Sequence, residues 1–108
     1  MAIEVDVLGT KYSIIKSDQT KDCKLENLAG YCDPTVNQIV VDTFKTNDMS
    51  KADLNQFEKE VIRHELVHAF LIESGLCDNS WGSNEEIVDW IAIQFPKMLK
   101  AFGEAGAI

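Results

Sequence analysis

The first half of the chain carries the alternation of apolar and polar residues that is typical of half-buried β-strands. Residues 3–8 (Ile-Glu-Val-Asp-Val-Leu) alternate with a period of two, a spacing that places every second side chain on the same face of a strand. Residues 11–16 (Lys-Tyr-Ser-Ile-Ile-Lys) follow shortly after Gly9, a residue that often separates strands. The two segments together predict a β-hairpin.

A second hairpin is predicted further along the first half. Its strands are residues 28–32 and 38–42, and Pro34 between them suits the second position of a tight turn because its ring presets the backbone angle φ. The polar segment before it predicts only a short helical turn around residues 24–27. The first half therefore predicts an antiparallel or mixed sheet of about three to four strands.

The second half changes to the 3.6-residue periodicity of helices. The segment from Ser50 to Asp53 resembles a capping box at the start of a long helix, and Gly75 is a natural end for that helix. Apolar residues and both histidines fall on one helix face: Leu54, Phe57, Val61, His64, His68 and Leu71. We therefore expect the two histidines to project from the face that meets the protein interior.

A second helix is predicted from Asn84 to Phe102. Its stripe begins with an acidic residue and continues at three- and four-residue steps: Glu85, Val88, Ala92, Phe95 and Leu99. Pro96 is expected to kink this helix or shift its last turns, because it lacks the N–H that would bond to Ala92. Together the patterns predict a small α+β fold that forms a single domain over residues 1–108.

Composition narrows the class of protein. The chain has 108 residues, of which 45% are apolar, as in one small globular domain. No apolar run approaches the ~20 residues of a membrane-spanning helix, and the acidic N-terminus does not resemble a signal peptide. We therefore expect a cytosolic protein without membrane contact. Its net charge of −8 makes binding to nucleic-acid phosphates unfavourable, and nothing in the sequence indicates an oligomeric state.

The three cysteines fit the same compartment. Cys23, Cys32 and Cys77 are odd in number, widely spaced and free of any CxxC pair. Neither a disulfide framework nor a zinc knuckle is indicated. We expect free thiols.

The strongest chemical signal is the segment His64-Glu65-Leu66-Val67-His68. Two imidazoles four residues apart share one helix face, so their ring nitrogens can bind a single Zn²⁺ ion. The glutamate between them lies about 100° around the helix from the first histidine and can reach a zinc-bound water without acting as a ligand. His64 and His68 are thus the candidate metal ligands, and Glu65 is the candidate general base.

A catalytic zinc needs a third protein ligand, and the sequence has no third histidine. Glu85 is the best candidate, because a carboxylate on an otherwise apolar helix face is costly unless a cation meets it. Glu86 falls on a more exposed flank of the same helix. Asp89, one turn after Glu85, is placed to accept the second ring N–H of a ligating histidine.

These residues resemble a known family. The HExxH segment followed by Asn84-Glu85 and then Asp89 is similar to the gluzincin arrangement of metallopeptidases. That resemblance implies a zincin-like domain, one Zn²⁺ ion, a glutamate after the asparagine as third ligand, and an aspartate one turn later that supports a histidine. The small size and short upstream sheet are similar to compact metallopeptidases of the ImmA/IrrE type, which are often encoded by phages or mobile elements.

The two resemblances differ by one residue at the third ligand. In the ImmA/IrrE type the ligand glutamate is usually followed by a pattern that Glu86, Ile87 and Val88 would match, which implies Glu86. The helix-face argument favours Glu85, and we adopt Glu85 as the predicted ligand.

The implied reaction is hydrolysis of a peptide bond in a peptide or protein substrate, with a zinc-activated water and Glu65 as general base. An extended substrate is expected to pair with an exposed strand edge at residues 38–42. Tyr12, Tyr31 and Arg63 are candidates to stabilise the developing negative charge.

A zinc-stabilised binding module without catalytic activity is the alternative. A purely structural site would be expected to close with a fourth protein ligand, for which Glu73 and Cys77 are candidates. The intact Glu65 favours the enzyme, because a structural site has no need of a base.

Overall fold

The first predicted hairpin is present. In the computed structural model, which describes residues 2–43, 54–76 and 81–108, β1 (Ile3–Val7) pairs antiparallel with β2 (Thr10–Ser17). Leu8 and Gly9 form the connecting turn with positive φ angles of 52° and 94°. This backbone twist matches that of the flanking strands in a two-residue hairpin.

The second hairpin joins the first through its later strand. β3 (Gly30–Asp33) and β4 (Gln38–Asp42) are antiparallel, and β4 also pairs in parallel with β2, so the strand order is β1-β2-β4-β3. The expectation that residues 38–42 form an exposed edge is therefore wrong. β4 has a neighbour on both sides, and its three central residues are 1% exposed or less. The edge strand on this side of the sheet is β3, the neighbour of β4.

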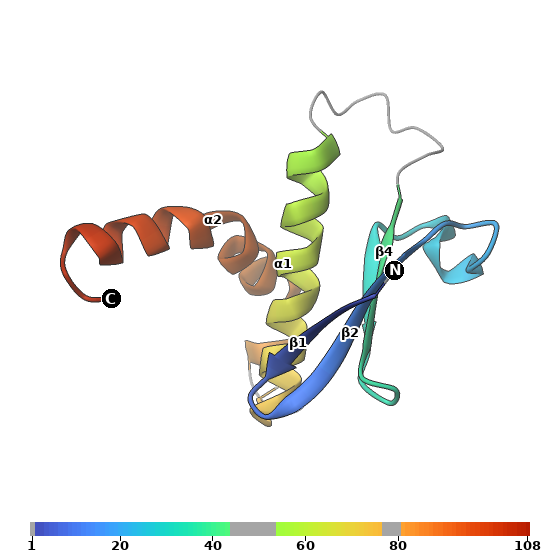
Figure 1. Cartoon of the computed structure of the whole chain (residues 1–108), viewed down its shortest axis with the longest axis horizontal. Helices are drawn as coiled ribbons and strands as arrows, with labels where there is room; N and C mark the ends of the chain where they lie inside the picture. The colour runs from blue at the N-terminus through green and yellow to red at the C-terminus, as the bar shows by residue number, and fades with distance from the viewer. Residues whose placement is uncertain (1, 44–53, 77–80) are drawn as a thin grey trace.

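One long helix covers a face of this mixed sheet (Figure 1). This helix is α1 (Leu54–Glu73), and the core between it and the sheet contains Val7, Tyr12, Ile14, Ile39, Val41, Val61 and Ala69. The short 3-10 helix η1 (Cys23–Glu26) matches the predicted helical turn and lies on the opposite side of the sheet in Figure 1. The α+β class is thus confirmed.

The C-terminal end of α1 lies where the sequence predicts it. Gly75 adopts a φ angle of 81°, and its N–H donates to the carbonyl of Ile72 while the N–H of Leu76 donates to that of Leu71. This pair of hydrogen bonds is the usual way to satisfy the last carbonyls of a helix. The predicted capping box at Ser50 to Asp53 lies outside the described residues.

The face of α1 that meets the sheet differs from the predicted stripe. Its most buried positions include Glu65 and Ala69, which are 8% and 0% exposed. The side chains of His64 and His68 remain 19% and 18% exposed. The histidines therefore lie at the contact between α1 and α2 and not in the core under the sheet, so the expectation that they face the protein interior is met only in part.

The second helix, α2 (Glu85–Glu104), follows the short 3-10 helix η2 (Trp81–Ser83) and packs against α1. Asn84 caps its start: the Asn84 side chain accepts a hydrogen bond of 3.0 Å from the N–H of Ile87. Val88 and Ala92 are fully buried, as the stripe predicts. The start of α2 is therefore held firmly beside α1.

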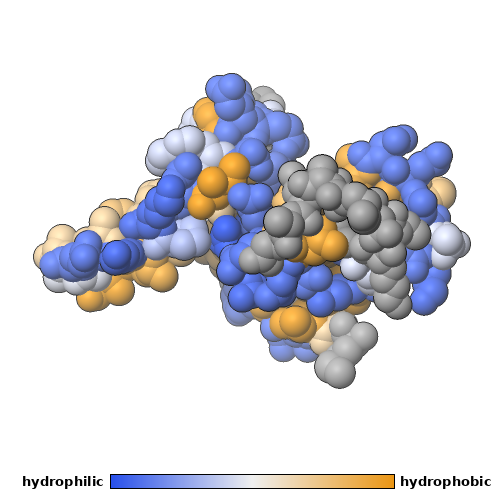
Figure 2. Space-filling model, turned by 90° about the horizontal axis from the view of Figure 1, so that it is seen from above, coloured by the Kyte–Doolittle hydropathy of each residue, from blue (hydrophilic) through white to orange (hydrophobic). Residues whose placement is uncertain are grey.

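The C-terminal half of α2 extends away from α1 and the sheet (Figure 1). Phe95 and Leu99 were expected on the buried stripe, but they are 42% and 46% exposed. Phe95 still borders a groove with side chains of α1 such as Phe70, whereas the helix beyond it extends away from α1. Figure 2 shows hydrophobic residues gathered on one side of the extension. Pro96 lies inside the continuous helix. Neither described helix combines the length and hydrophobicity needed to cross a membrane.

Candidate metal site

Three potential ligand atoms from two helices meet where α1 contacts the start of α2. His64 Nε2 lies 2.9 Å from Glu85 Oε1, and His68 Nε2 lies 3.1 Å from the same oxygen. The four-residue spacing on α1 places both imidazoles on one flank, with ring centroids 4.9 Å apart. The Asn84 cap sets Glu85 in the first turn of α2, opposite the two rings. Among the described residues, these three form a group able to hold one metal ion.

His64 has a carboxylate oxygen at each of its ring nitrogens. Its Nδ1 atom lies 3.1 Å from Asp89 Oδ1, and its Nε2 atom lies 2.9 Å from Glu85 Oε1. A neutral imidazole carries one N–H and can donate only one of these two hydrogen bonds. A cation bound by both Nε2 and Glu85 Oε1 would leave the ring proton on Nδ1, where it can be donated to Asp89.

The donor set fits a zinc ion. Zinc binds imidazole nitrogen and carboxylate oxygen at about 2.0–2.2 Å in tetrahedral sites, which places neighbouring ligand atoms about 3.3 Å apart. The separations of 2.9 and 3.1 Å between Glu85 Oε1 and the two histidine nitrogens are close to this value. Two histidines and one glutamate also leave one of four positions open, as in catalytic rather than structural zinc sites.

The same contacts with the two histidines determine the proton affinity of Glu85. Partial burial acts to raise the pKa of Glu85, but hydrogen bonds from His68 and His64 and their charges hold it below the ordinary value. A carboxylate that stays ionised can accept hydrogen bonds or bind a metal over a wide pH range. Glu85 thus has the charge state that a ligand requires.

Glu65 lies beside the ligand group and is almost completely buried. It is 8% exposed, and no hydrogen bond to it is found among the described residues. Burial raises the pKa of Glu65 above its ordinary value, while the charges of His64 and His68 oppose this rise. A carboxylate whose pKa is raised takes up a proton more readily than an ordinary one, as a general base must.

Strand β3 packs closely against α1 next to Glu65. A Cβ atom at Gly30 would lie 2.9 Å from the carbonyl oxygen of Val40, 3.0 Å from Val61 Cγ1 and 3.6 Å from Glu65 Cγ. Only glycine allows the edge strand to come this near to the helix. Gly30 is not among the residues predicted for the site, although a glycine within a predicted strand is a signal of close backbone approach.

A cleft of about 430 Å³ lies along this contact. Residues 28–31 form one wall, and Phe57, Glu60 and Val61 of α1 form the other. His64, Glu65, Glu85 and Asp89 also line it. The cleft therefore joins the candidate metal site to the edge strand β3, so that a molecule in the cleft would lie next to the ligand group.

The structure separates the two candidates for the third ligand. Both carboxylates are exposed, but Glu85 contacts both histidines, whereas Glu86 lies outside the group that could hold a metal ion. The fourth-ligand candidate Glu73 is engaged elsewhere, because Thr10 and Tyr12 donate hydrogen bonds of 2.8 Å to its two carboxylate oxygens. The other candidate, Cys77, lies outside the described residues.

The three candidates for charge stabilisation are also separated. Tyr12 is fully buried and donates its hydroxyl to Glu73, which together with burial raises its pKa. Arg63 donates its Nε–H to the carbonyl of Ala92 at 2.6 Å and so ties α1 to α2. Tyr31 lines the cleft, and its hydroxyl donates to Asp22. Of the three, only Tyr31 is placed beside the candidate site.

Two thiols are described, and both are free. Cys23 is exposed and Cys32 is half-buried. Burial, followed by the negative charge of Glu65, raises the pKa of Cys32 to about 11. Neither belongs to the group able to hold a metal ion.

Comparison of this chain with known protein families, with curated proteins and with solved structures finds no match. Its function is therefore inferred from the residues of the site alone. Four residues selected from the sequence meet there: His64, His68, Glu85 and Asp89. Glu65 lies beside them in the same cleft.

Proposed function

We propose that this protein is a zinc-dependent metallopeptidase that hydrolyses a peptide bond in a cytosolic peptide or protein. One observation carries the proposal. The Nε2 atoms of His64 and His68 meet the same carboxylate oxygen of Glu85, and the buried carboxylate of Glu65 lines the cleft beside them. The free state of both described thiols supports a cytosolic location.

Each residue has a distinct task in this proposal. His64, His68 and Glu85 hold the zinc ion, and Asp89 keeps the proton of His64 on Nδ1 so that Nε2 presents its lone pair. When bound, zinc supplies a Lewis acid and lowers the pKa of water at the site. Glu65 accepts a proton from the attacking water and donates it to the nitrogen of the leaving amine. Burial of Glu65 keeps its carboxylate fixed and away from bulk solvent.

Strand β3 is the proposed docking edge for an extended substrate. Its outer side has no neighbouring strand in the described part of the chain, and its first residues line the cleft. A peptide that adds to this edge gains backbone hydrogen bonds and brings its carbonyl groups past the metal ligands. This role replaces the one predicted for residues 38–42.

A three-ligand set favours catalysis over a structural module. A structural zinc site closes with four protein ligands. Within the described residues the ligand group has three members, and Glu73 is held by Thr10 and Tyr12. A buried carboxylate at Glu65, beside the ligands, has no use in a site that only stabilises the fold.

The test combines metal content with one substitution. We expect about one zinc per chain in both the wild-type protein and Glu65→Gln, measured by elemental analysis after purification without chelators. Cleavage of a random octapeptide library, followed by mass spectrometry, should fall by about 100-fold or more in Glu65→Gln. Glu58→Gln is the matched control, because Glu58 lies on the same helix but pairs with Lys16 at 2.8 Å.

Three results would contradict the proposal. Zinc in both proteins with no cleavage by either would favour the binding module. Absence of zinc in the wild-type protein would contradict both readings. Equal cleavage by the wild-type protein and Glu65→Gln would exclude Glu65 as the general base.

A further inference from the structure

The cleft has a strongly acidic lining. Glu60, Glu65, Glu85 and Asp89 contribute carboxylates to it, and neither lysine nor arginine is among its lining residues in the described chain. Three of these groups already have tasks: Glu85 contacts the histidines, Asp89 orients His64, and Glu65 is the proposed base. A cleft lined by charge of one sign concentrates ligands of the opposite sign.

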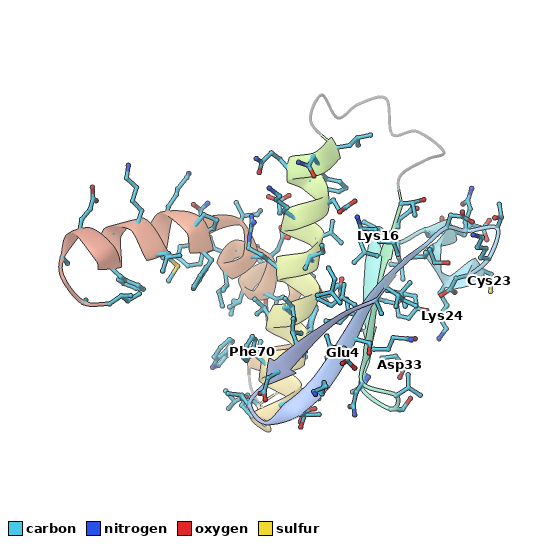
Figure 3. All side chains as sticks on the ribbon, in the orientation of Figure 1. Glu4, Lys16, Cys23, Lys24, Asp33 and Phe70 are labelled. Carbon is cyan, nitrogen blue, oxygen red and sulfur yellow. The ribbon has the colours of Figure 1, made fainter. Side chains whose placement is uncertain are left out.

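Glu60 is the carboxylate of this cleft that the catalytic proposal leaves unused. It is half-buried in the wall that α1 contributes, and no ion pair among the described residues includes it. The nearby cation Lys24 lies 5.0 Å from the centre of the Tyr31 ring and does not line the cleft. Figure 3 shows Lys24 near Cys23, on the side of the sheet away from α1.

The position of Glu60 relative to His64 matches the spacing of an extended peptide. Four helical residues cover about 6 Å along the axis of α1, and side chains two residues apart on one face of a strand are about 6.8 Å apart. Figure 1 shows α1 and β4, which pairs with β3, with their long axes in a similar direction. A peptide added to β3 would therefore run along α1, from the metal ligands past Glu60.

The wall beyond Glu60 is apolar. Phe57 lies about one helical turn beyond Glu60, on the side away from His64. On the opposite wall of the cleft, Leu28 is 49% exposed. A lysine or arginine side chain has an apolar stem and a charged end. Such a side chain can pack its stem against Phe57 while its cation reaches Glu60.

From these observations we propose that the cleft selects peptides with lysine or arginine two residues from the scissile bond, on the side toward the N-terminal end of α1. Glu60 is the residue that determines this preference. The inference rests on the proposed peptidase function, since it takes the metal ligands as the place of the scissile bond. It names the substrate class as cationic peptides with an extended backbone.

The test measures binding separately from cleavage. The zinc-loaded full chain with Glu65→Gln is titrated into fluorescein-labelled octapeptides of alanine and valine that carry a single lysine, glutamine or glutamate at each position in turn. We expect lysine at one position to improve affinity about three- to fivefold over glutamine, as for a partly exposed ion pair, and glutamate there to weaken it. Adding Glu60→Gln should abolish the preference.

Glu104→Gln is the matched control, because it removes the same charge from the far end of α2. It should leave the lysine preference intact. A lysine preference that survives Glu60→Gln, equal affinity for all peptides, or no measurable binding would overturn the inference. Cleavage by the wild-type protein is then assayed on the same peptides. A Glu60-dependent preference without cleavage would contradict the peptidase proposal and leave the cationic specificity of the cleft standing.

Discussion

The Nδ1 atom of His64 lies 3.1 Å from Asp89 Oδ1, while the Nε2 atom of the same ring meets Glu85. Asp89 therefore decides which ring nitrogen of His64 is free to bind a metal. We predict that Asp89→Ala lowers zinc affinity about 10- to 100-fold without abolishing binding. Competition with a chelating dye measures the change.

Asp89→Asn refines this prediction. Its side-chain oxygen can still accept the Nδ1–H, but it lacks the charge that raises the basicity of the ring. Its affinity should fall between those of the wild-type protein and Asp89→Ala. Wild-type affinity in Asp89→Ala would show that His64 is oriented by packing alone.

The pair Glu85 and Glu86 offers a direct comparison of adjacent carboxylates. We predict that Glu85→Ala reduces zinc affinity by more than about 100-fold, because it removes a ligand rather than a supporting group. Glu86→Ala should change it less than about twofold, since Glu86 is exposed and outside the ligand group. Calorimetric titration distinguishes the two, and the reverse order would assign the ligand to Glu86.

Gly30 is predicted to be essential for stability. Gly30→Ala places a methyl group 2.9 Å from a backbone oxygen of β4, which the strand can relieve only by moving away from α1. We expect a loss of about 1–3 kcal/mol in the free energy of unfolding. Gly103→Ala is the control, because a Cβ atom there meets nothing within 4 Å and alanine favours a helix by about 0.5–1 kcal/mol. Urea denaturation should show a lower free energy of unfolding for Gly30→Ala and a higher one for Gly103→Ala than for the wild-type protein.

The raised pKa of the Cys32 thiol predicts that the protein loses stability at alkaline pH. Its pKa is raised from 9.0 to about 11 in the fold, so the unfolded chain releases this proton first as the pH rises. The free energy of unfolding should therefore fall between pH 9 and 11, by on the order of 1–2 kcal/mol from this group. Below pH 9 its contribution is constant.

Urea denaturation under reducing conditions at pH 8 to 11 measures this slope. Cys32→Ala should show a shallower fall than the wild-type protein, and Cys23→Ala should follow the wild-type curve because Cys23 is exposed. Identical slopes for all three proteins would contradict the assignment to Cys32.

Local sequence patterns were sufficient to predict most of the helices and turns. Gly75 ends α1 as the sequence predicts, and α2 begins within one residue of the predicted start at Asn84, since these signals act on neighbouring backbone groups. The meeting of His64 with Glu85 followed from helix periodicity together with the cost of an unpaired carboxylate on an apolar stripe. Glu85 nevertheless remains exposed, so the premise that its burial on an apolar face requires a cation is wrong.

Long-range pairing was harder to predict. The β-branched residues of the segment 38–42 fit a strand but do not determine which strands pair with it. The run Ile39-Val40-Val41 was the available signal, because three consecutive buried residues indicate a strand covered on both faces. The burial of Glu65 had no such signal, since its place opposite Gly30 depends on how β3 docks on α1.

The parallel junction between β2 and β4 has a consequence for how the chain folds. Each hairpin joins segments close in sequence and can form early, whereas the junction must bring together strands separated by the whole β3 region. Loop closure of this kind slows folding. β3 joins the sheet only through β4, so we expect the chain to form its helices and hairpins before the cleft between β3 and α1 is complete.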